Sequence, residues 1–321
     1  MLCVFIYGVT SSSNLLRRND INLSGDVSRN ETINWDTYQR MFPGISITPN
    51  SESTFLNNLE FIISHNSLNR SYKLGINSFM HISEGEWKSR FDNLTQYVTV
   101  DESTYEKKSF FSTPASWDWR EQGVTTSVKD QKSCGSCYSF SATETVETTW
   151  AIRSSELLVL SPQQIVDCSK LNSGCNGGLQ SRVYKYLQST EQCLESDYQY
   201  TAVDGKCVTC KGAISKLSGY VSIKAGDEKA MEQSLFVTSL AVAIQADQKE
   251  FQLYKSGVLD FNCGKTLDHA VTIEGYGTEN GKDYWLVRNS WGTTWGEKGY
   301  IKMARGKDLC GISQSVVYPK F

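Results

Sequence analysis

Apolar residues in the N-terminal part of the chain recur at helical spacing. Residues 30–66 predict two helices, and the first ends at Pro43 because proline cannot continue a helix. In the second helix the apolar residues lie three and four positions apart: Phe55, Leu56, Leu59, Ile62 and Ile63. Residues 92–112 are polar and charged without periodicity, which predicts a linker.

After the linker the pattern changes from helices to strands. Apolar positions predict a helix from Cys137 to about residue 153, followed by shorter helices over 161–168 and 178–189. Beyond residue 240 the apolar runs are short and separated by glycine, which favours strands: 241–246, 270–276, 284–288 and 300–304. A helical half followed by a strand-rich half predicts an α+β fold with a cleft between the halves.

The composition excludes two classes of partner. Of the 321 residues, 39% are hydrophobic, which is enough for a sizeable core. The net charge of −3 lacks the basic excess of a nucleic-acid binder. No apolar run reaches the roughly 18 residues that a transmembrane helix needs. We therefore expect no nucleic acid as a partner and no membrane span.

The ten cysteines favour an oxidising compartment. The apolar run over residues 2–9 precedes small residues, so we expect residues 1–13 to be a signal peptide. This run lacks the usual preceding basic residues, and a truncated start is the alternative reading. Four sequons, at Asn22, Asn30, Asn69 and Asn93, also favour a glycoprotein. We expect the protein to be lysosomal, vacuolar or secreted.

Cys137, His269 and Asn289 are the candidate catalytic residues. A thiol, an imidazole and a carboxamide are the parts of a cysteine-nucleophile hydrolase. The chain has three histidines, and the other two lie in the N-terminal part, so His269 is left to act as the base. Gln131 is a candidate hydrogen-bond donor to an oxyanion.

The cysteines also permit other functions. Cys134 and Cys137 form a C-x-x-C pair of the kind found in redox proteins and zinc sites, and Cys207 and Cys210 form a second pair. Neither function accounts for His269, so we expect no metal and no cofactor. A relative that binds peptides without cleaving them is the remaining alternative.

At these residues the chain resembles the papain-like cysteine proteases with a cathepsin L-like propeptide. Residues 134–138 read CGSCY, the family pattern around the nucleophile, and His269 and Asn289 follow at about the family's 130–150 residues. The resemblance runs from about residue 33 to the C-terminus and includes further motifs at residues 118–120, 174–178, 198–200 and 289–296. It implies a papain-like two-lobed α+β fold, in which the active-site cleft lies between a helical lobe and a β-barrel-like lobe. It also implies an inhibitory helical propeptide over residues 14–112 and a peptidase domain over 113–321.

The resemblance gives each candidate a role. Cys137 is the nucleophilic thiolate at the start of its helix, and His269 is its ion-pair partner and base. Asn289 orients the imidazole, and Trp291 shields that hydrogen bond from water. Gln131 and the backbone N–H of Cys137 stabilise the oxyanion.

The resemblance also implies a pocket for the substrate residue two positions before the scissile bond. Gly178 lets the substrate backbone approach closely and pair as an extended strand. The lining positions are Leu179, Gln180, Ala243, Leu267 and Ser315. Most are small or apolar and none is acidic, so we expect a preference for aliphatic or aromatic residues, weakened by Gln180. Ordinary core packing is the alternative role for Ala243 and Leu267.

The resemblance carries over three disulfides: Cys134–Cys175, Cys168–Cys207 and Cys263–Cys310. We predict a fourth, Cys193–Cys210, because the two cysteines flank residues 198–200 and their pairing leaves one thiol, that of the nucleophile, after propeptide removal. The segment between the first pair has no insertion with extra histidines. The occluding loop of dipeptide-removing relatives is therefore expected to be absent, which implies an endopeptidase.

One propeptide motif departs from the family pattern. Gly75, Asn77 and Phe79 match the motif Gly-x-Asn-x-Phe-x-Asp, but His81 stands where the motif has Asp. Because histidine titrates near pH 6.5, we expect the pH response of activation to differ. The expected partners are polypeptide substrates, the propeptide as an intramolecular inhibitor and cystatin-type inhibitors, and we expect a monomer.

Overall fold

The computed structural model describes residues 33–91, 94, 112–261 and 263–321. The chain divides into two compact units, Met1–Ile45 and Ser46–Phe321. The expected signal peptide and three of the four sequons lie outside the described residues, as does most of the expected linker; the fourth sequon residue, Asn69, is exposed.

The described part of the first unit contains α1 (Trp35–Met41). The Asn34 side chain accepts a hydrogen bond from the Thr37 N–H at 2.9 Å, which satisfies one of the unpaired donors at the helix start. The helix ends just before Pro43, as the sequence predicts.

The described helices of the second unit are α2 (Ser51–Asn66), α3 (Glu84–Lys88), α4 (Cys137–Ser154), α5 (Pro162–Cys168), α6 (Gln180–Leu187), α7 (Glu228–Leu235) and α8 (Lys249–Gln252). Short 3-10 turns cover Gly174–Asn176 and Leu309–Gly311. The predicted helices over 161–168 and 178–189 correspond to α5 and α6. The hydroxyl of Ser161 accepts a hydrogen bond from the Gln164 N–H, and Pro162 occupies the first turn, so α5 begins where its sequence favours a helix start.

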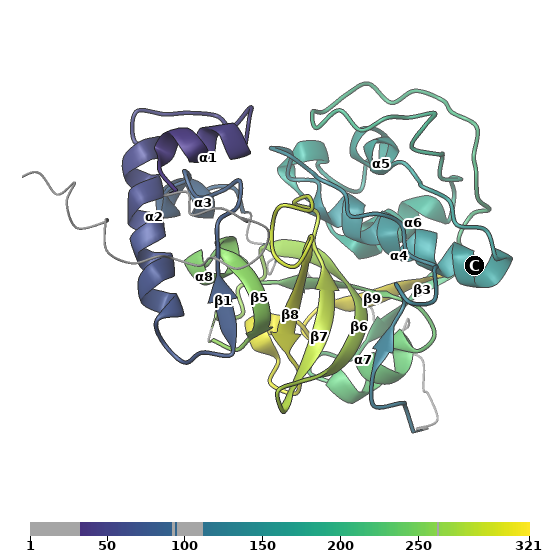
Figure 1. The fold of residues 1–321 in the computed structure, drawn as a ribbon. Coiled ribbons are helices and arrows are strands. Elements are labelled where there is room, and N and C mark those ends of the chain that lie inside the picture. Colours follow the sequence, from purple (N-terminus) through teal and green to yellow (C-terminus); the bar gives the residue numbers. More distant parts are fainter. Residues whose placement is uncertain (1–32, 92–93, 95–111, 262) are drawn as a thin grey trace, which may run out of the picture. The chain divides into compact units, whose positions relative to one another are not determined.

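Helix α4 is the central helix of the second unit. Its residues from Cys137 to Thr148 are buried, and it contacts α5, α6, β4 (Leu240–Ile244), β6 (His269–Glu279) and β9 (Val316–Lys320). Figure 1 shows α4 lying between the other two helices and the sheet. Because it is buried on nearly all sides, α4 lacks the polar face of a surface helix.

The described strands form one mixed sheet. The remaining strands are β1 (Tyr72–Leu74), β2 (Trp117–Asp118), β3 (Gly219–Ile223), β5 (Tyr254–Leu259), β7 (Lys282–Arg288) and β8 (Tyr300–Ala304). Their order is β1-β5-β8-β7-β6-β4-β9-β3, and β2 pairs with β6. The order runs from one edge to the other, so the sheet of described strands is open. The predicted α+β class is confirmed.

Strand β1 comes from the segment before residue 112 and joins the edge of this sheet. It pairs antiparallel with β5, with Tyr72 opposite Gly257. The Val258 N–H donates to the Ser71 carbonyl at 2.9 Å, and the Gly75 N–H donates to the Leu253 carbonyl at the same distance. Residues expected to form the propeptide thus contribute a strand to the sheet of the expected peptidase domain.

Candidate active site

Cys137 is the first residue of α4, and its side chain is 8% exposed. The turn before it is held by the Cys134–Cys175 disulfide and by the Gly135 N–H, which donates to the Cys175 carbonyl at 2.9 Å. Cys137 stands outside the four disulfides of the described residues. A sulfur at a helix N-terminus lies in partial positive charge, which stabilises a thiolate.

His269 begins β6 and is held by Asn289, the residue that follows β7. His269 Nε2 lies 2.8 Å from Asn289 Oδ1. The Ser290 N–H donates to the same Oδ1 at 2.8 Å, which identifies that atom as the acceptor. His269 Nε2 therefore carries the proton, and Nδ1 is left to accept one.

Trp291 covers this hydrogen bond. Its ring stacks on the imidazole of His269, with centroids 4.7 Å apart and planes at 27°. Burial lowers the pKa of His269 to about 4, and the hydrogen bond with Asn289 opposes that shift. The imidazole is thus shielded from water and favours the neutral form in the intact chain.

Gln131 links the turn before α4 to the segment after Asn289. Its Nε2 donates to the Cys134 carbonyl at 3.0 Å, and its Oε1 accepts from Ser290 Oγ at 2.6 Å. The Gln131 N–H also donates to the Ser290 carbonyl at 2.8 Å. A side-chain amide has two N–H groups, so a second donor remains for a ligand.

Leu94 fills the expected substrate pocket. Its side chain is 3% exposed and clusters with Leu179, Ala243 and Leu267. The Leu94 N–H donates to the Leu267 carbonyl at 2.7 Å. Leu179 precedes α6, whereas Ala243 lies on β4, so the pocket draws on the helical and the strand-rich parts of the chain.

The other expected pocket residues lie beside these. Gly178 precedes Leu179, and the Ser315 carbonyl accepts from the Ala243 N–H at 3.1 Å. A Cβ built on Gly178 would lie 2.4 Å from Asn172 Oδ1, so this position suits glycine. Gln180 is buried, and its amide donates to the Val242 carbonyl at 2.9 Å, into the core rather than toward Leu94.

Aromatic residues from before residue 112 pack over the same site. The Trp87 ring lies edge-on to Trp291 at 5.0 Å between centroids, and its Nε1 donates to the Ala246 carbonyl at 3.3 Å. The Phe91 ring is 5.9 Å from the His269 ring. Asn77 Nδ2 donates to the Gln252 carbonyl at 2.8 Å, which anchors the preceding turn. Together these residues shield the site from solvent.

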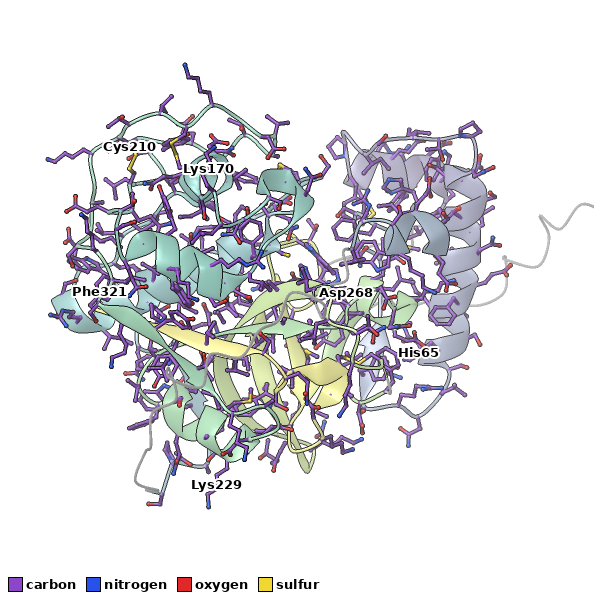
Figure 2. All side chains as sticks on the ribbon, turned by 180° about the vertical axis from the view of Figure 1, so that it is seen from behind. His65, Lys170, Cys210, Lys229, Asp268 and Phe321 are labelled. Carbon is purple, nitrogen blue, oxygen red and sulfur yellow. A yellow bond between two sulfur atoms is a disulfide. The ribbon has the colours of Figure 1, made fainter. Side chains whose placement is uncertain are left out.

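The eight paired cysteines form Cys134–Cys175, Cys168–Cys207, Cys193–Cys210 and Cys263–Cys310. These are the pairs expected above. Figure 2 shows Cys210 toward the top of the view, together with Lys170, which follows α5, whereas Lys229 of α7 lies at the bottom.

The described part of the chain was also compared with the requirements of a metal site and of a membrane span. Among its His, Cys, Asp and Glu side chains, no group of three or more is arranged to hold a metal ion. None of its helices is long and apolar enough to cross a membrane.

Sequence reasoning missed Phe91 and Leu94. Leu94 falls in the segment predicted to be a polar linker, and its signal there is one apolar residue among polar neighbours. Sequence reasoning also missed the buried ion pairs that Arg288 forms with Glu144 and Glu274. The pattern of polar and apolar residues does not predict these ion pairs, because charged residues within a helix or strand usually lie on the protein surface.

Two family descriptions match the chain. Residues 113–320 match the papain family cysteine protease family, and residues 37–87 match the cathepsin propeptide inhibitor domain. These matches fit the predicted order of an inhibitory segment followed by a protease segment.

Curated relatives include the probable cysteine protease RD21B of Arabidopsis thaliana and the oryzain beta chain of Oryza sativa subsp. japonica. The first is 42% identical over 83% of this chain and 59% of its own length. The second is 39% identical over 83% of this chain and 60% of its own length. The chain thus spans about three fifths of the length of these relatives.

Solved proforms share the fold. The proform of the Amb a 11 cysteine protease, a ragweed pollen allergen, is 31% identical, with a TM-score of 0.84 over 89% of this chain and 93% of its own. The digestive procathepsin L 3 of Tenebrio molitor larval midgut is 32% identical, with a TM-score of 0.80 over 89% of this chain and 98% of its own. The papain-like two-lobed architecture with a helical propeptide is therefore confirmed.

Proposed function

Because the chain belongs to the papain family of cysteine proteases and carries a propeptide inhibitor domain, we propose that it is the zymogen of an endopeptidase that uses Cys137 as its nucleophile. The observation that carries this proposal is the hydrogen bond between His269 and Asn289 beneath Trp291. It holds the imidazole with Nδ1 as the proton acceptor, as a cysteine nucleophile requires.

In the first half of the reaction, His269 Nδ1 takes the proton of the Cys137 thiol. The thiolate attacks the peptide carbonyl carbon, a C–S bond forms, and the carbonyl oxygen becomes an oxyanion. The second N–H of Gln131 Nε2 and the backbone N–H of Cys137 stabilise that charge, and each such donor typically contributes a few kcal/mol. The imidazolium then protonates the leaving amine as the C–N bond breaks.

In the second half, water hydrolyses the acyl-enzyme. His269 takes a proton from the water, whose oxygen attacks the thioester carbon. The C–S bond breaks, the thiolate is restored, and the substrate leaves as a carboxylic acid. No metal or cofactor takes part in these steps.

We propose that substrates place an aliphatic or aromatic residue two positions before the scissile bond. The burial of Leu94 among Leu179, Ala243 and Leu267 supports this preference, because these apolar side chains already accommodate a leucine. Arginine would bury its charge there without a facing acid, at a large desolvation cost.

We also propose the organisation that the family resemblance implies. Residues 14–112 act as the inhibitor and residues 113–321 as the monomeric peptidase, which acts on polypeptides and binds cystatin-type inhibitors. The four disulfides support a lysosomal, vacuolar or secreted location, because disulfides persist in oxidising compartments.

One experiment tests the proposal and its alternatives. The purified chain is acidified, and mass spectrometry follows the loss of about residues 1–112, with a Cys137→Ala chain as the uncleaved control. Alkylation of Cys137 and hydrolysis of dipeptidyl substrates with leucine, phenylalanine or arginine are then measured. We expect processing, a reactive thiol and preference for the apolar substrates.

Other results would contradict the proposal in distinguishable ways. A folded chain that binds peptides but neither matures nor hydrolyses them indicates a binding protein. Stoichiometric release of zinc on thiol alkylation indicates a metal module. Cleavage dominated by arginine substrates leaves the mechanism intact and refutes the specificity.

A further inference from the structure

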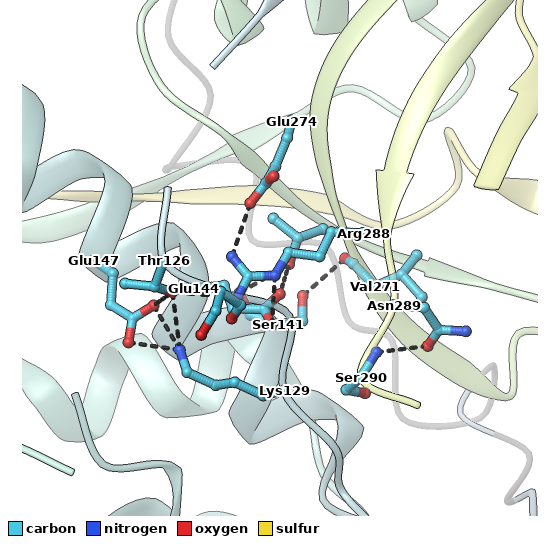
Figure 3. A network of polar contacts seen from close by, with 12 residues as sticks. Thr126, Lys129, Ser141, Glu144, Glu147, Val271, Glu274, Arg288, Asn289 and Ser290 are labelled. Carbon is cyan, nitrogen blue, oxygen red and sulfur yellow. Dashed lines mark hydrogen bonds and ion pairs between the residues drawn. The ribbon is translucent and has the colours of Figure 1, made fainter. Parts of the chain in front are cut away.

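Three buried charged residues meet in the interior of the second unit. Arg288 Nη1 lies 3.0 Å from Glu274 Oε1, and Arg288 Nε lies 3.1 Å from Glu144 Oε1. Their side chains are at most 2% exposed. Figure 3 shows the guanidinium between the two carboxylates. We call Glu144, Glu274 and Arg288 the buried charge cluster.

Each member of the cluster lies on an element that carries a candidate catalytic residue. Glu144 is on α4, which begins with Cys137. Glu274 is on β6, which begins with His269. Arg288 ends β7 and directly precedes Asn289. The cluster therefore joins the three segments from which the catalytic residues project.

Further hydrogen bonds fix the carboxylates of the cluster. Glu144 Oε2 accepts from Thr272 Oγ1 at 2.8 Å, and Glu274 Oε2 accepts from the Tyr300 hydroxyl at 2.7 Å. Both donors come from strands of the sheet, so the carboxylate on α4 is bonded to a strand as well as to Arg288.

The guanidinium of Arg288 also forms hydrogen bonds with the segment before α4. Its Nη2 donates to Thr126 Oγ1 at 3.2 Å and to the Ser127 carbonyl. These residues belong to the segment that leads toward Gln131 and α4. A planar guanidinium presents its donors in a rigid fork, so one side chain can fix several segments in a set geometry.

We propose that Arg288 is a positioning residue, which with Glu144 and Glu274 sets the placement of Cys137 relative to His269 and Asn289. This proposal rests on the catalytic roles proposed above. Buried ion pairs contribute little to stability overall, but they can specify one arrangement of the elements that carry them. Reacting groups tolerate little misplacement, since an error of about 1 Å can lower the rate about 100-fold.

The cluster also makes this placement dependent on pH. The groups that face Glu144 are Arg288 from β7, Glu274 from β6 and Lys129 from the segment before α4. Lys129 is paired with Glu147, one turn further along α4, at 2.6 Å. Arg288 therefore faces two carboxyl groups, and an ionised Glu144 leaves one buried negative charge in excess.

The sign of the pH effect follows from this excess. Burial raises the pKa of Glu144 to about 7, although Arg288 and Lys129 oppose the shift. Because the pKa of Glu144 is higher in the folded protein than its unfolded value of 4.5, this carboxyl stabilises the folded protein fully below pH 4.5. That stabilisation is lost as the pH rises through about 7. The cluster thus favours the active placement at acidic pH.

The test uses the full chain, matured by acid, with three variants. In Arg288→Lys, a single ammonium replaces the fork, so kcat and the rate of Cys137 alkylation should fall about tenfold while KM changes less than about twofold. In Glu144→Gln, the excess charge is removed. Its kcat/KM should match the wild type at pH 5 and should be about threefold higher at pH 8.

Val146→Ala is the matched control. Val146 lies on the same helix, is fully buried and belongs to an apolar core cluster that contains none of the three charged residues. Val146→Ala should lower the melting temperature and leave both kcat and the pH profile of hydrolysis unchanged. Hydrolysis by this variant also shows that the proposed chemistry operates. If Arg288→Lys loses stability as this control does, with kcat and alkylation within about twofold of the wild type, the positioning role is wrong.

The comparison of Glu144→Gln with the wild type at pH 5 and pH 8 does not depend on Arg288→Lys. It therefore tests the proposal even if the Arg288→Lys variant does not fold. A Glu144→Gln enzyme with the wild-type decline between pH 6 and 8 would overturn the cluster's role in pH dependence. An inactive Val146→Ala enzyme with an inactive wild type would instead contradict the proposed function itself.

Discussion

The ring of Phe91 lies edge-on to the imidazole of His269, with centroids 5.9 Å apart and planes at 80°. Phe91 precedes residue 112, whereas His269 belongs to the segment that matches the protease family. The segment that we propose to be inhibitory therefore packs against the proposed base, and this packing adds to the burial that lowers the pKa of His269.

We predict that maturation raises the pKa of His269. Burial lowers that pKa to about 4 in the intact chain, so removal of residues 1–112 should move it toward its ordinary value of 6.5. In the intact chain the resulting stabilisation is present above pH 6.5 and is lost as the pH falls toward 4. NMR titration of the imidazole in Cys137→Ala chains, with and without residues 1–112, measures the change. Equal pKa values in the two chains would contradict the prediction.

Truncation of Leu94 should weaken inhibition in the intact chain. Leu94→Ala removes a buried side chain from its contacts with Leu179, Ala243 and Leu267, at a cost of about 2 kcal/mol. The rate of Cys137 alkylation before processing should rise up to about 30-fold. Leu68→Ala is the control, because Leu68 is 49% exposed. Similar rates for the two variants would argue against occupancy of the pocket by Leu94.

His81 should set part of the pH dependence of maturation. Burial lowers the pKa of His81, Arg90 lowers it further, and Glu86 opposes the shift. Protonation therefore destabilises the propeptide as the pH falls below 6.5. In His81→Asp, a carboxylate near Arg90 should move the onset of maturation to lower pH. His81→Asn, which does not titrate, serves as the control, and an unchanged profile for His81→Asp would refute this role.

Loss of the Cys193–Cys210 disulfide should lower stability without abolishing catalysis. The bond closes a loop with a sequence separation of 17, for which chain entropy predicts a contribution of about 3 kcal/mol. Cys193→Ala/Cys210→Ala should therefore melt at a lower temperature and still hydrolyse a dipeptidyl substrate. Non-reducing peptide mapping of the wild type checks the bond itself, and recovery of Cys193 as a thiol would rule it out.

Elements with a strong local pattern could be predicted from the sequence. The expected helix from Cys137 to about residue 153 corresponds to α4, and the apolar run over 241–246 corresponds to β4. In α4 the apolar residues Phe140, Val146 and Trp150 recur among polar ones in a pattern that predicts a helix. In β4 the apolar run is continuous because both faces of the strand are buried. The histidine and asparagine motifs also identified His269 and Asn289, which the structure joins by a hydrogen bond, and Cys137 begins α4 where the sequence predicts a helix start.

Features that depend on distant pairing could not be predicted. Strand β1 has three residues and exists through its pairing with β5, which is far away in the sequence. The buried charge cluster likewise unites residues from three elements, and each charge alone has the pattern of a solvated side chain. Leu94 lay in a polar run, and only the fold brings it to its pocket.

The pairing of β1 with β5 makes maturation an event at the edge of a sheet. While residues 71–75 are in place, the Val258 N–H and the Leu253 carbonyl have partners in the same chain. Cleavage and departure of that strand open a row of backbone donors and acceptors, and such rows recruit extended strands from other molecules. We therefore expect β1 to cover this sheet edge in the intact chain, so that the edge of β5 becomes accessible only after the propeptide leaves.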